Sequence, residues 1–267
     1  MAVFDQNVHS DFLIHWTGKD IDRDDPNWDD PGYVMPSDIA DRYADRLASI
    51  LTHGFWMTEE PERTVTVEPH PAIVIPPVVR TCFTELKLSL SRQHAHQYGR
   101  MGIGMKRPYA VNRKGRSLVY YAYYDETKDP FIHACLRDFK ERELLGYLQP
   151  MNRPKPKGVR RKMVFDLYAE SEWRIVLRPE LDAEGWSVLP PPSLTTGPGT
   201  APKRLLPLDG WLAIIIYPDI EVKKRCQRPR GPVRRQIRRI KSTADHGNRV
   251  EPGNWPAEIN LDDCRNF

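Results

Sequence analysis

The chain has 267 residues, of which 40% are hydrophobic, and its 40 basic and 36 acidic side chains leave a formal net charge of +4. A chain of this length and apolar content can bury a full core, so we expect it to fold alone. No apolar run approaches the roughly 18 residues of a membrane-spanning helix, and the first residues lack the basic-then-apolar layout of a secretory signal, so we expect a cytoplasmic protein with no membrane partner.

The cysteines and histidines give no strong metal-binding pattern. Cys82, Cys135, Cys226 and Cys264 are widely scattered and show no C-x-x-C spacing, which favours reduced thiols over a zinc site. The histidines on either side of Ala95 could hold a metal from one face of a strand, but no carboxylate or thiolate stands nearby at ligand spacing. We therefore expect no metal.

The first predicted elements are a strand and a helix. Residues 12–17 form a β-prone run in which His15 and Thr17 share one face. An acidic loop follows, and apolar residues then recur at spacings of three and four. Ser37 offers an N-cap and Gly54 a C-terminal stop, so the pattern predicts a helix between them.

The rest of the chain is assigned from β-propensity, periodicity, turn residues and proline content. We expect an irregular Pro-rich connection at 59–77, a strand at 78–84, a loop with a short helix at 85–99, a hairpin of strands at 101–106 and 118–124, an amphipathic helix at 130–148, a basic loop at 153–162, a strand at 165–177, a long exposed connection at 189–207, a strand buried on both faces at 211–217, and a basic helix at 223–241 with poor order beyond Ala244.

The strand at 165–177 carries the charged residues of greatest interest. Strand periodicity places Glu170, Glu172 and Arg174 on one face and apolar residues on the other. Carboxylates two residues apart on a strand lie about 7 Å from each other. This spacing suits a site that holds a sugar hydroxyl beside a developing positive charge. A cross-strand Glu–Arg ladder on a solvated face is the structural alternative.

The segment from Lys223 to Lys241 contains ten bases and no acid. Such a segment contacts nucleic-acid phosphates with strong salt dependence. The basic composition of this segment is explained equally well by binding to an acidic partner protein or to the Asp-rich region of this chain near its N-terminus. The candidate residues for nucleic-acid or partner binding are Lys223, Lys224, Arg225, Arg234, Arg235, Arg238 and Arg239.

Several short motifs occur together in the order of a known family. They are His15-Trp16-Thr17, Leu47-x-x-Ile50-Leu51-x-x-Gly54-Phe55, Cys82-Phe83-Thr84-Glu85-Leu86, His94, Tyr98-Gly99, Gly102-Ile103-Gly104, Val119-Tyr120, Glu172-Trp173-Arg174-Ile175 and Ile215-Ile216-Tyr217-Pro218-Asp219. Over residues 12–225 this series resembles the AbiGi family of abortive phage-resistance proteins. The resemblance implies the antitoxin-like partner of a two-gene abortive-infection system whose other gene encodes a nucleotidyltransferase-like protein.

The first strand and helix also resemble ADP-ribosyltransferases of the DarT type. In these, a His-x-Thr strand precedes a helix of the form Leu-x-x-Ile-Leu-x-x-Gly, and a glutamate on a later strand completes the site. This resemblance implies an α+β fold with a mixed or antiparallel central sheet and flanking helices. We expect an ADP-ribosyltransferase-like domain at 1–222 and a basic, partly disordered extension at 223–267.

The same resemblance implies NAD as the substrate and gives each candidate residue a role. His15 would bond a ribose hydroxyl, Thr17 and Thr84 would line the dinucleotide, Glu172 would hold the nicotinamide ribose, Glu170 would orient the acceptor, and Arg174 would meet the pyrophosphate. The expected function is an anti-phage protein that uses NAD to modify a macromolecular target, nucleic acid rather than protein. Two alternatives remain: a non-catalytic antitoxin or nucleic-acid-binding partner of a nucleotidyltransferase-like toxin, and an NAD glycohydrolase.

Overall fold

The computed structural model describes residues 12–22, 28, 30, 32–65, 73–85, 87–121, 142–150, 152–153, 165–166, 171–194, 202–242 and 255–266. It is a mixed α and β structure with a mostly antiparallel sheet and flanking helices. The chain divides into two compact units. The first unit is drawn from Met1–Phe55, Phe83–Asn112 and Leu206–Phe267, and the second from Trp56–Cys82 and Arg113–Leu205.

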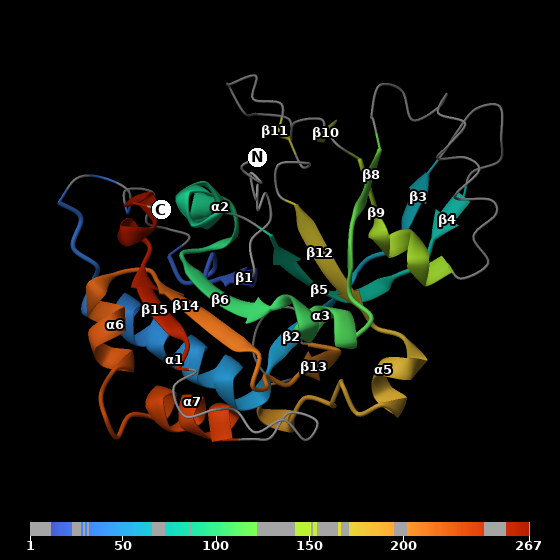
Figure 1. The fold of residues 1–267 in the computed structure, drawn as a ribbon. Helices are drawn as coiled ribbons and strands as arrows, with labels where there is room; N and C mark the ends of the chain where they lie inside the picture. The colour runs from blue at the N-terminus through green and yellow to red at the C-terminus, as the bar shows by residue number, and fades with distance from the viewer. Residues whose placement is uncertain are drawn as a thin grey trace, which may run out of the picture. The chain divides into compact units, whose positions relative to one another are not determined.

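The sheet of the first unit is built around three long strands (Figure 1). These are β1 (Phe12–Thr17), β6 (Met101–Lys106) and β14 (Leu212–Tyr217). Strand β6 is antiparallel to both β1 and β14, and β15 (Ala257–Asn260) pairs with β14 in parallel. The end of β5 (Val78–Thr84) pairs with β1, with Thr84 opposite Ile14.

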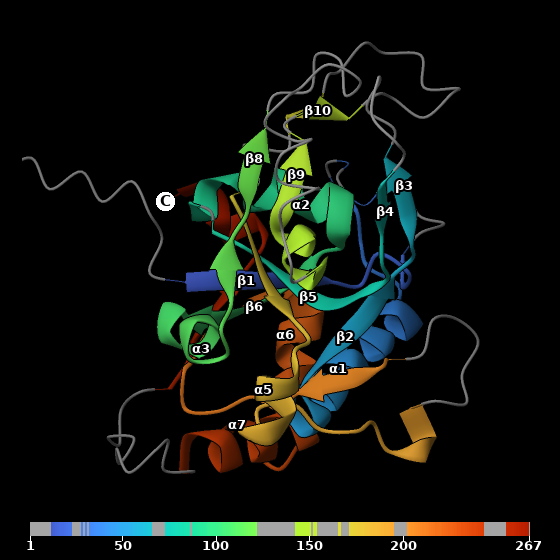
Figure 2. The same cartoon turned by 90° about the vertical axis from the view of Figure 1, so that its right-hand side faces the viewer.

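Helices cover both faces of this sheet. Figure 2 shows α2 (Ser91–Tyr98) on one side of β1 and β6, and α1 (Ser37–His53), α6 (Ile220–Cys226) and α7 (Pro232–Ser242) on the other. The shorter elements of this unit are η1 (Leu88–Leu90), α3 (Arg107–Asn112) and η6 (Asp262–Asn266).

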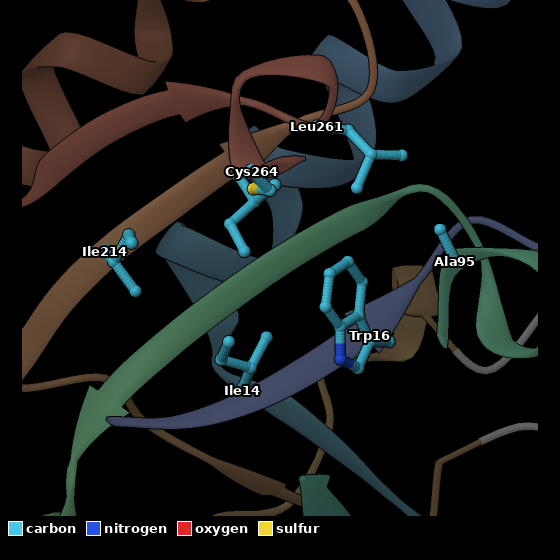
Figure 3. Close-up of a cluster of buried hydrophobic side chains, with 7 residues drawn as sticks. Ile14, Trp16, Ala95, Ile214, Leu261 and Cys264 are labelled. Carbon is cyan, nitrogen blue, oxygen red and sulfur yellow. The ribbon is translucent and has the colours of Figure 1, made fainter. Parts of the chain in front are cut away.

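The core on the α2 side is an apolar cluster that joins segments distant in sequence (Figure 3). Burial of such surface stabilises the fold by about 25 cal/mol per Å². Because the cluster includes residues from the last described segment, that segment is fixed to the sheet. The cluster contains Ile14, Trp16, Ala95, Ile214, Ile216, Leu261 and Cys264.

The second unit contains other strands of the same nine-stranded sheet and three two-stranded pairs. Strand β5 lies between β2 (Phe55–Glu60) and β12 (Glu172–Val176), β7 (Arg116–Ser117) pairs with β12, and β13 (Arg204–Leu206) pairs with β2. The pairs are β3 (Arg63–Val65) with β4 (Ile73–Ile75), β8 (Val119–Tyr121) with β9 (Leu148–Pro150), and β10 (Asn152–Arg153) with β11 (Phe165–Asp166). Its helical segments are η3 (Arg142–Tyr147), α5 (Pro179–Ala183) and η5 (Pro192–Leu194).

The structure confirms the elements that show clear periodicity. Strands occupy 12–17, 78–84 and 101–106, and α1 runs from Ser37 to His53 with Gly54 as its C-cap. The predicted N-cap is wrong, because Pro36 stands at that position and Ser37 is the first helical residue. The apolar run at 211–217 is also a strand, and five of the six residues of β14 are buried. In α7 the predicted apolar face of Val233, Ile237 and Ile240 is buried.

Predictions that depended on turn chemistry are wrong in several places. Strands β6 and β8 form no hairpin, because α3 separates them and β6 pairs with β1 and β14. The expected irregular connection at 59–77 contains the end of β2 and the β3–β4 pair. The exposed connection at 189–207 contains β13, and residues 195–201 lie outside the described residues.

The expected strand at 165–177 is divided. Its described parts are β11 and β12, and Ser171, next to β12, has φ +44°, which extended backbone does not adopt. Residues 167–170 lie outside the described residues, as do most of the predicted helix at 130–148 and of the basic loop at 153–162. The described end of that helix is instead η3 followed by β9.

The predicted basic helix at 223–241 is two helices, because Pro229 and Gly231 interrupt it between α6 and α7. The prediction of poor order beyond Ala244 is wrong for 255–266, which form β15 and η6. The expected domain boundary at residue 222 does not coincide with the division of the chain. Both α7 and β15 belong to the first unit, where β15 continues the sheet.

Candidate functional site

The two described charged residues of β12 form a buried ion pair in the second unit. Arg174 donates from Nε to Glu172 Oε1 at 2.7 Å and from Nη2 to Glu172 Oε2 at 3.1 Å. Its Nη1 donates to the carbonyl of Gly146 in η3. Arg174 is only 2% exposed. Strand periodicity thus correctly placed the acid and the base on one face, whereas Glu170 lies outside the described residues.

Neighbouring side chains extend this polar row. The thiol of Cys82 donates a hydrogen bond to Glu172, and Arg80 pairs with Glu60 at 2.7 Å. Cys82 and Arg80 are two residues apart on β5, so they share one face of that strand. The arrangement differs from the solvated cross-strand ladder expected as the structural alternative, because Glu172 and Arg174 pair within one strand and are largely buried. Of these two ion pairs, only that of Arg80 with Glu60 joins two strands.

The electrostatics of the pair keep both partners charged. Burial raises the pKa of Glu172, but the charge of Arg174 and its hydrogen bonds outweigh burial, so the pKa lies below its ordinary 4.5. For Arg174, burial lowers the pKa, but the negative charge of Glu172 raises it by more, so the pKa of Arg174 lies above its ordinary value. Burial, followed by the negative charge of Glu172, raises the pKa of the Cys82 thiol to about 12. The site therefore holds one ionised carboxylate beside a neutral thiol.

His15 and Thr17 lie in the first unit with different surroundings. The imidazole of His15 packs against the rings of Phe55 at 4.8 Å and Phe83 at 5.8 Å between centroids. Thr17 accepts a hydrogen bond from Arg46 Nη1 at 3.2 Å. Both residues are partly buried on the same face of β1.

Thr84 extends from the opposite face of the first unit's sheet. Its strand partner is Ile14, and residues paired across a ladder share a face. His15 follows Ile14 and therefore points the other way. Thr84 is 7% exposed. The structure thus brings His15 and Thr17 together and separates Thr84 from them.

Six of the seven candidate bases of α6 and α7 contact other groups of the first unit. Arg225 bonds Asp41 and Ser37, so one base of this segment does pair with the Asp-rich region. The remaining contacts are those of Lys223 with the Glu258 carbonyl, Lys224 with Glu221, Arg234 with Glu258 and the Trp255 ring, Arg238 with the Pro229 carbonyl, and Arg239 with the Thr52 carbonyl. The exposed Arg235 guanidinium contacts no partner within the described part of the chain.

A buried arginine in the first unit was missed by the sequence reasoning. Arg100 donates from Nε to Asp22, which also accepts a hydrogen bond from the Tyr43 hydroxyl at 2.8 Å. The guanidinium lies 5.1 Å from the Trp28 ring centroid and 5.2 Å from that of Tyr33. These hydrogen bonds and cation–π contacts anchor the acidic loop to the rest of the first unit. No sequence pattern around Tyr98 and Gly99 indicated that Arg100 would be buried.

A cavity of about 420 Å³ in the second unit was also missed. Its lining residues come from segments on which the sequence reasoning placed no site. They are Lys114, Arg116, Ser117, Val119, Leu144, Tyr147, Leu148, Arg178 and Glu180. The lining residues are spread over three segments and form no local motif, so only the fold shows that these segments meet.

Within the described residues, no helix has the length and apolar character needed to cross a membrane, and no three potential metal ligands gather in one place. Comparison of the chain with protein-family models, curated proteins and solved structures gives no match. The geometry above is therefore the basis for the functional proposal.

Proposed function

We propose that this chain is an anti-phage abortive-infection protein that acts as an ADP-ribosyltransferase, using NAD to modify a macromolecular target, nucleic acid rather than protein. The observation that carries the proposal is the ionised carboxylate of Glu172, fixed on β12 by Arg174. Its side chain is 13% exposed.

The chemistry requires a negative charge rather than an acid. Cleavage of the bond between ribose and nicotinamide passes through an oxocarbenium-like state, which a carboxylate beneath the ribose stabilises. Nicotinamide leaves as a neutral molecule from a pyridinium that is already charged, so no proton is needed. A carboxylate has about four lone-pair sites. Arg174 and Cys82 occupy three on Glu172, and the remaining one can accept a ribose hydroxyl.

The surroundings change several of the expected roles. Arg174 is a positioning residue rather than a pyrophosphate ligand, because its guanidinium is buried and bonded to Glu172 and Gly146. Thr84 is left out of the dinucleotide contacts because it extends from the face opposite His15. His15 and Thr17 belong to the first unit and Glu172 to the second, so the proposal assigns the ribose contact to Glu172 alone. Glu170 keeps its expected role of orienting the acceptor.

The test follows nicotinamide release from NAD with purified protein and candidate nucleic acids. The variants are Glu172→Gln and the double variant Glu172→Gln with Arg174→Met, in which the charges are removed as a pair. Glu59→Gln is the matched control, because Glu59 is an exposed glutamate on another strand of the same unit. We expect the control to be active and both Glu172 variants to lose at least a hundredfold in rate.

Product analysis separates this proposal from its enzymatic alternative. Modified nucleic acid supports transfer, whereas free ADP-ribose with no modified acceptor supports an NAD glycohydrolase. Equal nicotinamide release by the wild type and the folded double variant would remove Glu172 from the mechanism.

The second candidate is a non-catalytic antitoxin or nucleic-acid-binding partner of a nucleotidyltransferase-like toxin. It is favoured by three exposed arginines, Arg235, Arg238 and Arg239, which share one face of α7 at spacings of three and four. Replacing all three with Gln should weaken nucleic-acid binding and lower the slope of log K against log salt by about 0.9 for each lost phosphate contact. Arg225→Gln is the control, since that guanidinium is bonded to Asp41.

A further inference from the structure

The cavity of the second unit has the dimensions of a small-molecule site. Its volume is about 420 Å³, within the range of about 300–1,000 Å³ that is usual for ligand pockets. It is bounded by residues of β7, β8, η3 and β9 and by the start of α5. Glu172 and Arg174 do not line it, so the cavity is separate from the proposed catalytic carboxylate.

One wall of the cavity is strongly basic. Lys114, Arg116 and Arg178 contribute three positive charges against the single carboxylate of Glu180. Glu180 pairs with Arg178 at 3.2 Å, and Lys114 lies 3.6 Å from Glu184. Arg116 donates from Nη1 to the Gly115 carbonyl at 2.8 Å and has no carboxylate partner in the described segments. A guanidinium with spare donors, in a wall of net positive charge, is the group that binds phosphate most specifically.

The rest of the lining is apolar and aromatic. Val119, Leu144 and Leu148 supply aliphatic surface. Tyr147 is 8% exposed, and its hydroxyl donates to the Lys114 carbonyl at 3.3 Å, which fixes the ring beside Lys114. A ligand that fills this space therefore carries a phosphate at one end and a flat apolar group at the other.

We propose that this cavity binds a phosphate monoester with a flat apolar body, of the size of a nucleoside monophosphate. Arg116 forms the main phosphate contact, and the Tyr147 ring with Val119 and Leu148 receives the base. The inference rests on the cavity alone and requires no turnover of NAD. A second ligand site in the same unit gives the protein a means to respond to a phosphorylated metabolite.

The test is calorimetric titration of the full chain with adenosine 5′-monophosphate, adenosine and inorganic phosphate as probes. We expect the monophosphate to bind at least tenfold more tightly than either fragment, because only it offers a group to both the basic and the apolar lining residues. Arg116→Gln should weaken monophosphate binding roughly tenfold or more. Arg228→Gln, an exposed arginine in the first unit, is the control and should bind like the wild type.

Two further variants test the position of the ligand. Val119 is 49% exposed, so Val119→Trp narrows the cavity without disturbing the core and should also weaken binding. Glu172→Gln leaves the bond from Arg174 to the Gly146 carbonyl of η3 in place, so this variant should retain monophosphate binding while losing nicotinamide release, which separates this inference from the proposed function. Equal affinity of Arg116→Gln and the wild type, equal affinity for adenosine and its monophosphate, or no heat of binding with any probe would overturn the proposal.

Discussion

The Glu172–Arg174 pair gives the most direct test of the energetics of this fold. Arg174 is 2% exposed and donates hydrogen bonds to both carboxylate oxygens of Glu172. Glu172→Gln removes the negative charge and leaves one acceptor oxygen where there were two. The guanidinium stays buried and keeps its hydrogen bond to the Gly146 carbonyl. Breaking a buried pair in this way costs about 3–5 kcal/mol, and the residual amide contact places this variant near 3 kcal/mol.

The single change at Arg174 should lower the free energy of unfolding by less than the change at Glu172. Arg174→Met leaves Glu172, whose side chain is 13% exposed, within reach of water, so we expect about 2 kcal/mol. In the double variant a neutral amide faces a methionine of similar length, and no charge is left unpaired. We expect that chain to lose about 2 kcal/mol in total, which corresponds to a coupling energy of about 3 kcal/mol between the two positions.

Urea unfolding of the wild type and the three variants at pH 7 measures this coupling. A total stability of about 5–15 kcal/mol leaves room to resolve it. Because the pKa of Glu172 is lowered on folding from 4.5, the pair stabilises the folded chain above that pH, and the contribution is lost as the pH falls through the folded pKa. Losses that simply add in the double variant at pH 7 would refute the argument that the two charges support each other.

Three further predictions concern other parts of the fold. Burial lowers the pKa of His94 from 6.5 to about 4. As the pH falls through this range, His94 is protonated in the unfolded chain and neutral in the folded chain, so the free energy of unfolding should fall by about 3 kcal/mol. The His94→Gln variant should lack this pH dependence. Gly99→Ala should cost about 3 kcal/mol in thermal unfolding, because φ is +113° and a Cβ would lie 2.3 Å from Lys19 N; Gly32→Ala, with φ +85° and open space, should cost about 1 kcal/mol. Iodoacetamide at pH 8 should alkylate Cys82 about a thousandfold more slowly than free cysteine, since burial and Glu172 raise its pKa to about 12; a rate like that of the free amino acid, read by peptide mass spectrometry, would contradict this.

The parts of the fold that follow from sequence are those in which one local signal dominates. Helix α1 has a three- and four-residue apolar spacing and a glycine stop at Gly54, and both act within the segment itself. Strand β14 is an apolar run too short for a helix of the core. In both cases the chain needs no information from distant residues to specify the element.

The errors arise where distant residues decide. Strand β6 lacked a predicted partner other than β8, yet it lies between β1 and β14, which are distant in sequence. Residues 255–266 have no long periodic pattern, but Leu261 and Cys264 are buried against Ile14 and Trp16. Such pairings depend on the whole core, so local propensity could not show them.

The candidate site divides in the same way. Alternation along β12 correctly placed Glu172 and Arg174 on one face, because period two is intrinsic to a strand. The same rule separates His15 from Thr84 once their strands are paired, since Thr84 lies opposite Ile14. The register of that pair could not be read from sequence, and without it two residues with the right chemistry were assigned to one ligand.

The burial of Arg174 also determines how the catalytic proposal can be judged. If Glu172 served only stability, replacing Glu172 and Arg174 together would lower the free energy of unfolding slightly and leave nicotinamide release unchanged. If Glu172 stabilises an oxocarbenium ion, nicotinamide release is lost, because the double variant removes the negative charge whether or not the fold survives. The combination of retained stability and lost nicotinamide release therefore assigns Glu172 to the reaction, and retained stability with retained release assigns the pair to the fold alone.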